Sequence, residues 1–440
     1  MLKVLNLTTV LAQAILLNCG NVLASASSQM PLSGTSALAS STKKTIATER
    51  QIDEATSLIE EELVGVTKAK APSVSEAKVI HDFADNEYFF VSFAGQGYGV
   101  LNVANNDVVE LAPFSKAPFD PADGLDIHYV PWRGFYVHEG SDYVNLRTGK
   151  TLTDAQIVAM EEESSRYVSQ SIIDAEKEDS ENEKTSKKAN NTLSSKINRK
   201  MSSVSHPIES GLIYADHEVP YSWFFKRNIN QYPENDGDNC GYVAASMLLA
   251  YNEIFKCTGY FSSEQASAFI IPYTGDITYI NGEARWDGVP ELIDSFPHAV
   301  WGEDTAGTIP ADINEALEDF LKGKSVSYDV SYWYWLFDSI TPEIDGGSPV
   351  ALFGNHESPD PNAGGDGNHV TVVYGYYNNT NLLCHFGWDG YSQVVMSSLG
   401  LFRTGGWVSL TNHSAHRHNQ YFRRRATGSY YCGCGMLMTC

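Results

Sequence analysis

The sequence has little positive charge, and this shortage limits what the protein can bind. Its 440 residues include 30 Lys and Arg against 54 Asp and Glu, which gives a formal net charge of -24 at pH 7. A nucleic-acid surface needs clustered basic side chains that neutralise phosphates. The composition therefore argues against a nucleic-acid partner, and we expect the chain to attract basic substrates instead.

Long apolar runs are also scarce beyond the N-terminus. Lys3 is followed by a mostly apolar run over residues 4–17, and the small residues Ala24-Ser25-Ala26 come after it. This order is typical of a secretory signal peptide, so we predict that residues 1–26 are removed from a secreted, extracellular protein. No later run reaches the length needed to cross a bilayer, and no membrane span is expected.

The number of cysteines, seven, does not suit a full disulfide framework. Cys19 falls within the predicted signal peptide, and a lipidated cysteine is disfavoured there because Asn18 precedes it, where a small residue is expected. With Cys19 removed and Cys240 set aside as a thiol, an odd number remains. Cys432 and Cys434 are too few for a four-ligand zinc site without other residues, so we expect no metal or other cofactor.

The composition changes along the chain in a way that predicts further segments after the signal. Residues 27–155 contain one amphipathic helix, within residues 48–65, and then short β-rich runs separated by Gly- and Asn-containing turns. Residues 156–205 are rich in charge, Ser and Asn, and we interpret them as a polar linker with a maturation site. Aromatic and glycine content rises again over residues 206–412, and residues 413–440 form a Cys-containing C-terminal tail.

The stretch DGDNCGYVAASMLLAYNEIF, residues 236–255, places a cysteine at the entrance of an apolar helix. Apolar residues recur at steps of three and four from Cys240, which predicts one apolar stripe that faces a core. Asp238 or Asn239 would cap this helix, and the N–H groups of its first turn would favour a thiolate over a thiol. Cys240 is therefore a candidate nucleophile. The alternative is a small buried residue that happens to open a core helix.

A cysteine nucleophile needs a base, and the best candidate is His369. It follows a Gly-rich loop and opens the predicted strand HVTVVYGYY, so its side chain can face a cleft from a rigid position. Its separation from Cys240, 369 minus 240 or 129 residues, is close to the roughly 130 to 150 residues between nucleophile and base in papain-like chains.

Three blocks of the sequence, NCGYVAAS, GNHVTVVYGYY and HFGWDGY, resemble the Cys, His and post-His blocks of the papain-like cysteine peptidases. Among these, the secreted bacterial streptopain type is most similar, and the resemblance covers most of residues 215–400. It implies an α+β fold, with a papain-like peptidase domain preceded by a small α+β prodomain. It also implies a secreted cysteine endopeptidase that is made as a zymogen and hydrolyses a protein or peptide substrate.

The resemblance further implies a residue that orients the imidazole of His369. His385 stands where the family carries an Asn, which is a departure from the family pattern. Asp389 is the chemically better orienting group. A turn at Asn379-Thr380 would set Asp389 nearly opposite His369, whereas a turn centred nearer Tyr377 would put His385 there.

Two further residues are assigned by the resemblance alone. Gln231 is the only nearby Gln that could join the oxyanion hole. It lies nine residues before Cys240 (240 minus 231), which is a longer separation than the family pattern. Trp388 would be an aromatic lid that keeps water off the imidazole.

Two other functions are compatible with the same residues. A Cys-His pair on this fold could serve an amidase or a transglutaminase, because the same nucleophile supports acyl transfer to other acceptors. The chain could also be a non-catalytic secreted peptide-binding module, an alternative that the departure at His385 keeps open.

Overall fold

A computed structural model describes most of the chain between residues 49 and 439. The described ranges are 49–68, 72–147, 149–191, 211–226, 240–269, 309–333, 340–355, 369–378, 380–388, 390–400, 404–413, 429–431 and 437–439. All of them belong to one compact unit, Ile46–Cys440. The predicted signal peptide, Gln231, Asp389 and most of the predicted tail lie outside the described residues.

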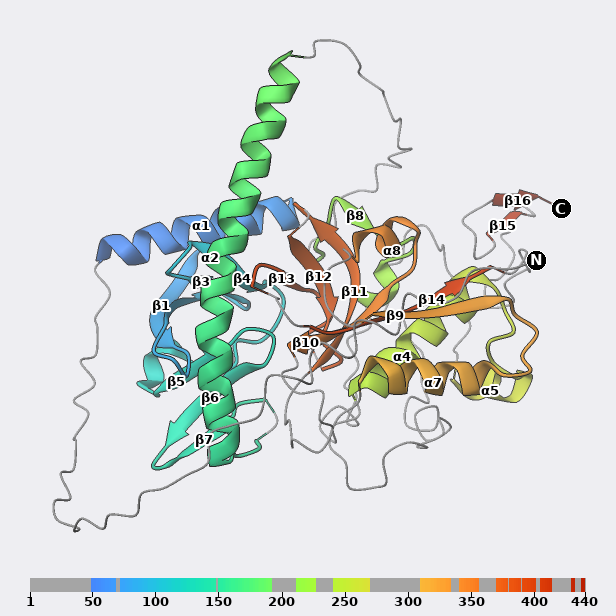
Figure 1. Cartoon of the computed structure of the whole chain (residues 1–440), viewed down its shortest axis with the longest axis horizontal. Helices are drawn as coiled ribbons and strands as arrows, with labels where there is room; N and C mark the ends of the chain where they lie inside the picture. The colour runs from blue at the N-terminus through green and yellow to red at the C-terminus, as the bar shows by residue number, and fades with distance from the viewer. Residues whose placement is uncertain are drawn as a thin grey trace, which may run out of the picture. The chain divides into compact units, whose positions relative to one another are not determined.

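One large sheet contains both the N-terminal and the C-terminal strands (Figure 1). Its strand order is β7-β6-β5-β1-β2-β3-β4-β13-β12-β11-β10-β14-β9, and β8 pairs with β11. The strands are β1 Val74–His81, β2 Glu87–Phe93, β3 Tyr98–Asn102, β4 Asp107–Ala112, β5 Ile127–Val130, β6 Gly134–Glu139, β7 Asp142–Asn145, β8 His217–Glu218, β9 Tyr328–Trp333, β10 Val350–Asn355, β11 Val370–Tyr377, β12 Asn381–His385, β13 Val394–Ser397 and β14 Thr404–Asn412. A separate hairpin pairs β15 Ser429–Tyr431 with β16 Leu437–Thr439.

Helices accompany this sheet, so the fold is mixed α and β, as the sequence predicts at this coarse level. The helices are α1 Glu49–Thr67, η1 Pro121–Asp123, α2 Asp154–Asn191, α3 Trp223–Lys226, α4 Cys240–Tyr251, the π-helix η3 Asn252–Lys256, α5 Ser263–Phe269, α7 Pro310–Leu321 and α8 Thr341–Asp345. None of the described helices is both long and apolar enough to cross a membrane.

Helix α1 packs closely on the N-terminal strands β2, β3 and β4. It is the amphipathic helix expected over residues 48–65, and its apolar face buries Ile59, Leu63 and Val66 completely. A Cβ added at Gly99 of β3 would lie 2.7 Å from Cγ2 of Ile59. Only a glycine therefore allows the helix to approach this strand so closely.

Helix α2, Asp154–Asn191, occupies most of the segment 156–205 that the sequence indicated as a polar linker. Its N-terminal part has a buried stripe at helical spacing, which includes Met160, Ser164, Tyr167, Val168 and Ser171. Two of these five residues are serines, so the average composition of the segment hid the amphipathic pattern. The stripe packs on the protein, since Asn102 Nδ2 lies 3.4 Å from the Ser171 hydroxyl.

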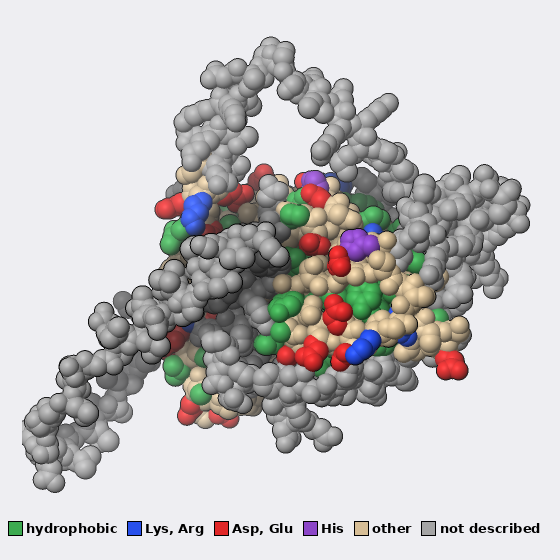
Figure 2. Space-filling view, turned by 45° about the vertical axis from the view of Figure 1, so that its right-hand side comes forward, with side chains coloured by type: hydrophobic (Ala, Val, Ile, Leu, Met, Phe, Trp, Pro, Cys, Tyr) green, Lys and Arg blue, Asp and Glu red, His purple; other side chains and the backbone are tan. Residues whose placement is uncertain are grey.

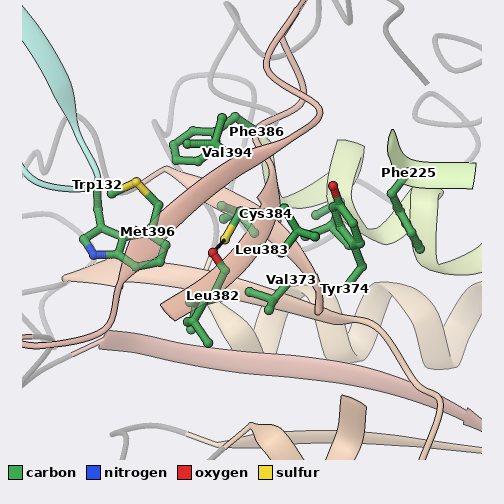
Figure 3. Packing of buried hydrophobic residues seen from close by; sticks show 14 of the residues in the cluster. Trp132, Phe225, Val373, Tyr374, Leu382, Leu383, Cys384, Phe386, Val394 and Met396 are labelled. Atoms are coloured by element: carbon green, nitrogen blue, oxygen red, sulfur yellow. Dashed lines mark hydrogen bonds between the residues drawn. The ribbon is translucent and has the colours of Figure 1, made fainter. Parts of the chain in front are cut away.

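Helix α4 begins at Cys240, as the sequence predicts, and packs against β10, β11 and α7. The prediction of a single apolar stripe is wrong, because nearly every residue of the helix is buried. Side chains of β11 and β12 pack in the core: Figure 3 shows Val373 near Leu382, Leu383 and Cys384, and Tyr374 beside Phe225. This packed layer gives the start of α4 and the start of β11 a rigid base.

The N-terminal and C-terminal strands are joined edge to edge at β4 and β13. The register pairs Leu111 with Val395 and Glu110 with Met396. A side-chain contact adds to this pairing, because Glu62 of α1 accepts hydrogen bonds from the Tyr377 hydroxyl and, at 2.6 Å, from Asn381 Nδ2. The N-terminal part of the chain is therefore docked directly on the strands that carry the candidate site.

Candidate active site

Cys240 is the first residue of α4, where N–H groups and the positive end of the helix dipole favour a thiolate. Its side chain is 7% exposed, and its sulfur is a reduced thiol. Helix α4 packs on β10 and β11, and His369 directly precedes β11, so the helix that Cys240 opens and the strand that His369 precedes belong to the same packed unit. The predicted capping residues, Asp238 and Asn239, lie outside the described residues.

His369 stands immediately before β11, and its backbone is tied to β10. Its carbonyl accepts a hydrogen bond of 3.1 Å from the Gly354 N–H. On the imidazole, Nε2 lies 2.6 Å from the carbonyl oxygen of Phe386. A carbonyl oxygen only accepts, so Nε2 carries the proton and, in the neutral ring, Nδ1 is left as a proton acceptor.

Trp388 covers the imidazole of His369. The two rings are stacked, with centroids 3.8 Å apart and an interplanar angle of 22°. The register of β11 and β12 accounts for this contact: Val372 pairs with His385, and the same register continued by three residues would set Trp388 across from His369. Trp388 thus lies where the sequence places an aromatic lid.

His385 and Asp389 were the predicted alternative partners for His369. The hydrogen bond that Nε2 of His369 donates in the structure goes to neither of these side chains. The acceptor is the backbone carbonyl of Phe386, the residue after His385. His385 is fully buried, and its Nδ1 accepts a hydrogen bond of 2.9 Å from the Gly387 N–H. His385 therefore stabilises the turn that carries both the Phe386 carbonyl and Trp388. Asp389 lies outside the described residues.

The electrostatic environment keeps the imidazole of His369 neutral. The pKa of His369 is lowered to about 3, and burial is the largest cause. The hydrogen bond to the Phe386 carbonyl opposes this lowering, whereas the positive charge of Arg147 and the neighbouring His385 add to it. At neutral pH, His369 in this form of the protein is an uncharged base.

Arg147, which the sequence analysis missed, lies against the aromatic side chains beside His369. Its Cζ is 4.4 Å from the ring centroid of Trp388, 4.3 Å from that of Tyr391 and 5.6 Å from that of Phe386. Arg147 follows β7 in a polar turn, and no motif in the sequence connects that turn with residues so far along the chain. A guanidinium over aromatic rings is a favourable cation–π arrangement.

Residues 115–116 of the N-terminal part contact the loop that carries Tyr391, and Trp132 contacts β10. The Ser115 hydroxyl donates a hydrogen bond of 2.8 Å to the Gly390 carbonyl, and the Tyr391 hydroxyl donates one of 3.0 Å to the Lys116 carbonyl. Trp132 lies near Gly354, the glycine that bonds to the His369 carbonyl, because a Cβ added at Gly354 would lie 4.0 Å from the Trp132 Cβ. The N-terminal part thus contacts both the Tyr391 loop and the strand beside His369.

The described residues offer no alternative metal chemistry. They contain no group of three or more His, Cys, Asp or Glu side chains that could hold a metal ion. Gln231, the predicted contributor to the oxyanion hole, lies outside the described residues, so its role stays a prediction.

Comparison with known proteins gives distant structural similarity but no relative in sequence. No protein-family model matches the sequence, and no curated protein matches it. Among solved structures, a mutant fragment of prointerpain A from Prevotella intermedia is similar at 12% sequence identity and a TM-score of 0.33. The match covers 76% of this chain and 98% of the fragment.

Proposed function

We propose that the chain is the precursor of a secreted cysteine endopeptidase, with Cys240 as nucleophile and His369 as base. The observation that carries this proposal is the hydrogen bond from His369 Nε2 to the Phe386 carbonyl. It fixes the imidazole in the tautomer whose Nδ1 can accept a thiol proton. The position of Cys240 at a helix entrance, where a thiolate is stabilised, supplies the matching nucleophile.

In this mechanism, the thiol proton of Cys240 moves to Nδ1 of His369 as the sulfur attacks the carbonyl carbon of a peptide bond. N–H groups at the start of α4 stabilise the oxyanion that forms. The imidazolium then gives its proton to the leaving amine, and an acyl-enzyme remains on Cys240. Water, deprotonated by His369, hydrolyses this intermediate and restores the thiol.

The N-terminal part has a role under this proposal: it keeps the site inactive. Burial and Arg147 both lower the pKa of His369, which disfavours the imidazolium and therefore the thiolate-imidazolium pair. Residues 27–155 would then be the prodomain that follows the signal peptide, residues 1–26. Because an intact helix resists proteolysis, we place the maturation cut in the predicted linker beyond α2.

The proposed substrate is a protein or peptide in the extracellular medium. Figure 2 shows acidic side chains spread over one face of the molecule with few Lys or Arg between them. A net charge of -24 favours the approach of basic polypeptides by electrostatic attraction.

The proposal is tested by measuring how the full chain hydrolyses an unfolded protein. The measurement is made before and after an added protease cuts the linker. We expect hydrolysis only after the cut, and none in the Cys240→Ser or His369→Gln variants. Cys257→Ser is the matched control, because it changes another buried thiol and should leave hydrolysis intact. Peptide binding without hydrolysis would support a binding module, and transfer of the acyl group to an added amine would support a transglutaminase.

A further inference from the structure

Three aromatic side chains, Phe386, Trp388 and Tyr391, form what we call the aromatic box. It holds the guanidinium of Arg147, at 4.3 Å and 4.4 Å from the nearer two ring centroids. Trp388 is at the same time stacked on His369, 3.8 Å away. A cation in the box therefore lies next to the candidate catalytic base.

The box is built within the C-terminal part of the chain. The Phe386 N–H donates a hydrogen bond of 2.9 Å to the Tyr391 carbonyl, and the Tyr391 N–H donates one of 3.1 Å to the Trp388 carbonyl. His385, fully buried, holds the same loop through the Gly387 N–H. These bonds do not involve Arg147. The Ser115 hydroxyl and the Lys116 carbonyl of the N-terminal part also bond to the Gly390 carbonyl and the Tyr391 hydroxyl, so the backbone bonds within the loop are what would keep the rings in place once that part leaves.

Arg147 is presented to the box by a tight turn. The Asn145 side-chain oxygen accepts a hydrogen bond of 2.9 Å from the Arg147 N–H. The Asn145 carbonyl accepts one of 2.8 Å from the Gly149 N–H, and the Asn145 N–H donates one of 2.8 Å to the Lys150 carbonyl. Gly149 has a φ of 70°, in the left-handed region that favours glycine. Arg147 is thus held at the apex of a closed turn.

An aromatic box recognises cations because the ring faces carry negative charge density. A guanidinium suits it better than an ammonium, since it is planar, stacks on rings and is more weakly hydrated. Once the N-terminal part leaves, the box would lose its cation while its rings stay in place. The net charge of -24 would attract a replacement from a basic polypeptide.

We propose that the aromatic box is a substrate subsite for the side chain of an arginine residue, and that Arg147 occupies this subsite in the precursor. This proposal rests on the proposed peptidase function, because it assumes that the scissile bond lies beside His369. It makes Tyr391 and Trp388 specificity residues, and it predicts cleavage next to arginine in preference to neutral residues of the same shape.

A binding experiment tests the subsite apart from the chemistry. Full chains that carry Cys240→Ala, with and without Arg147→Ala, are titrated by calorimetry with acetyl-arginine amide and with acetyl-citrulline amide, its neutral analogue. We expect the Arg147→Ala chain to bind the arginine probe about tenfold more tightly than the citrulline probe, which lies between the size of an exposed and that of a desolvated cation–π contact. The chain that keeps Arg147 should bind neither.

Variants of Tyr391 show whether the ring is responsible. Tyr391→Phe, which keeps the ring, should retain the arginine preference, and Tyr391→Leu should lose most of it. Circular dichroism verifies that each variant is folded, and Arg147→Gln serves in place of Arg147→Ala if the latter unfolds. Equal binding of the two probes to a folded Arg147→Ala or Arg147→Gln chain that keeps Tyr391, or no binding of either probe to it, would overturn the proposal.

Cleavage then separates this proposal from the peptidase proposal. Peptides that differ only in arginine or citrulline near the cleaved bond are given to the wild-type chain after its linker is cut. Hydrolysis of both at the same rate would overturn the subsite and leave the peptidase standing. Arginine binding by the chain that carries both Cys240→Ala and Arg147→Ala, without any peptide hydrolysis by the wild type, would leave the cation site standing and reject the peptidase.

Discussion

Removing the charge of Arg147 should raise the pKa of His369. The substitution Arg147→Gln keeps a polar side chain but takes the positive charge away. The Trp388 ring centroid lies 3.8 Å from the imidazole centroid of His369 and 4.4 Å from the Arg147 Cζ. The guanidinium of Arg147 and a protonated His369 would therefore be at most about 8 Å apart and would repel each other by Coulomb's law.

The size of the effect follows from this distance. Two unit charges about 8 Å apart repel by about 2 kcal/mol at an effective dielectric constant of about 20, and by about 0.5 kcal/mol in bulk water. Since one pKa unit corresponds to about 1.4 kcal/mol, the pKa of His369 should rise by about 0.4 to 1.5 units. It should stay below its ordinary value of 6.5, because burial is the largest cause of the lowering and persists in the variant.

The assay is NMR spectroscopy of isotope-labelled histidine in full chains that carry Cys240→Ala, followed from neutral to acid pH. Loss of one signal in a His369→Gln chain assigns the resonance. Arg166→Gln is the matched control, since it removes the same charge from α2. An unchanged or lowered pKa in Arg147→Gln, or an equal rise in Arg166→Gln, would refute the reasoning.

Three other substitutions test the packing around the site by urea unfolding. Burial raises the pKa of Glu62, so its contribution to stability is present at acid pH and is lost as the pH rises through that pKa. Glu62→Gln should therefore match the wild type in stability at acid pH and become relatively more stable as the pH rises. A difference in unfolding free energy that stays constant with pH would contradict this. Gly400→Ala should destabilise the fold by about 1 to 3 kcal/mol more than Gly124→Ala. Both glycines have a left-handed backbone, but only at Gly400 would a Cβ meet an atom, the Tyr167 carbonyl oxygen at 2.9 Å. Equal losses of unfolding free energy in the two variants would exclude this contact. His385→Leu leaves the Gly387 N–H without its acceptor and should lower the free energy of unfolding by about 1 to 3 kcal/mol. His385→Asn retains an acceptor and should cost less. The reverse order would count against His385 as the acceptor that stabilises this turn.

Local periodicity made several elements predictable from the sequence. Helix α1 and strands β2, β3 and β11 lie close to their predicted positions, because each carries its own apolar pattern and is bounded by turn residues. The start of α4 at Cys240 was predictable from the turn-forming residues before it, whereas its single apolar stripe was not confirmed, because nearly every residue of the helix is buried. These are properties of short segments, which a sequence displays directly.

The features that the sequence did not reveal are long-range or lie in the backbone. The partner of His369 Nε2 is the Phe386 carbonyl, and a carbonyl is common to every residue, so no side-chain motif marks it. The contact of Arg147 with the aromatic box joins segments far apart in the chain. Helix α2 was missed because serines occupy part of its buried stripe.

The central claim is that Cys240 and His369 form an activated pair. The most direct test is to treat the protein with an epoxide that alkylates activated thiols and to locate the adduct by mass spectrometry. The wild type and His369→Ala are compared, each as the intact chain and after its linker is cut. We predict a single adduct on Cys240 of the cut wild type, little on the intact chain, and none on cut His369→Ala. No adduct on Cys240 after the cut, or equal labelling of the two cut chains, would contradict the claim and identify Cys240 as a core residue at the start of a buried helix.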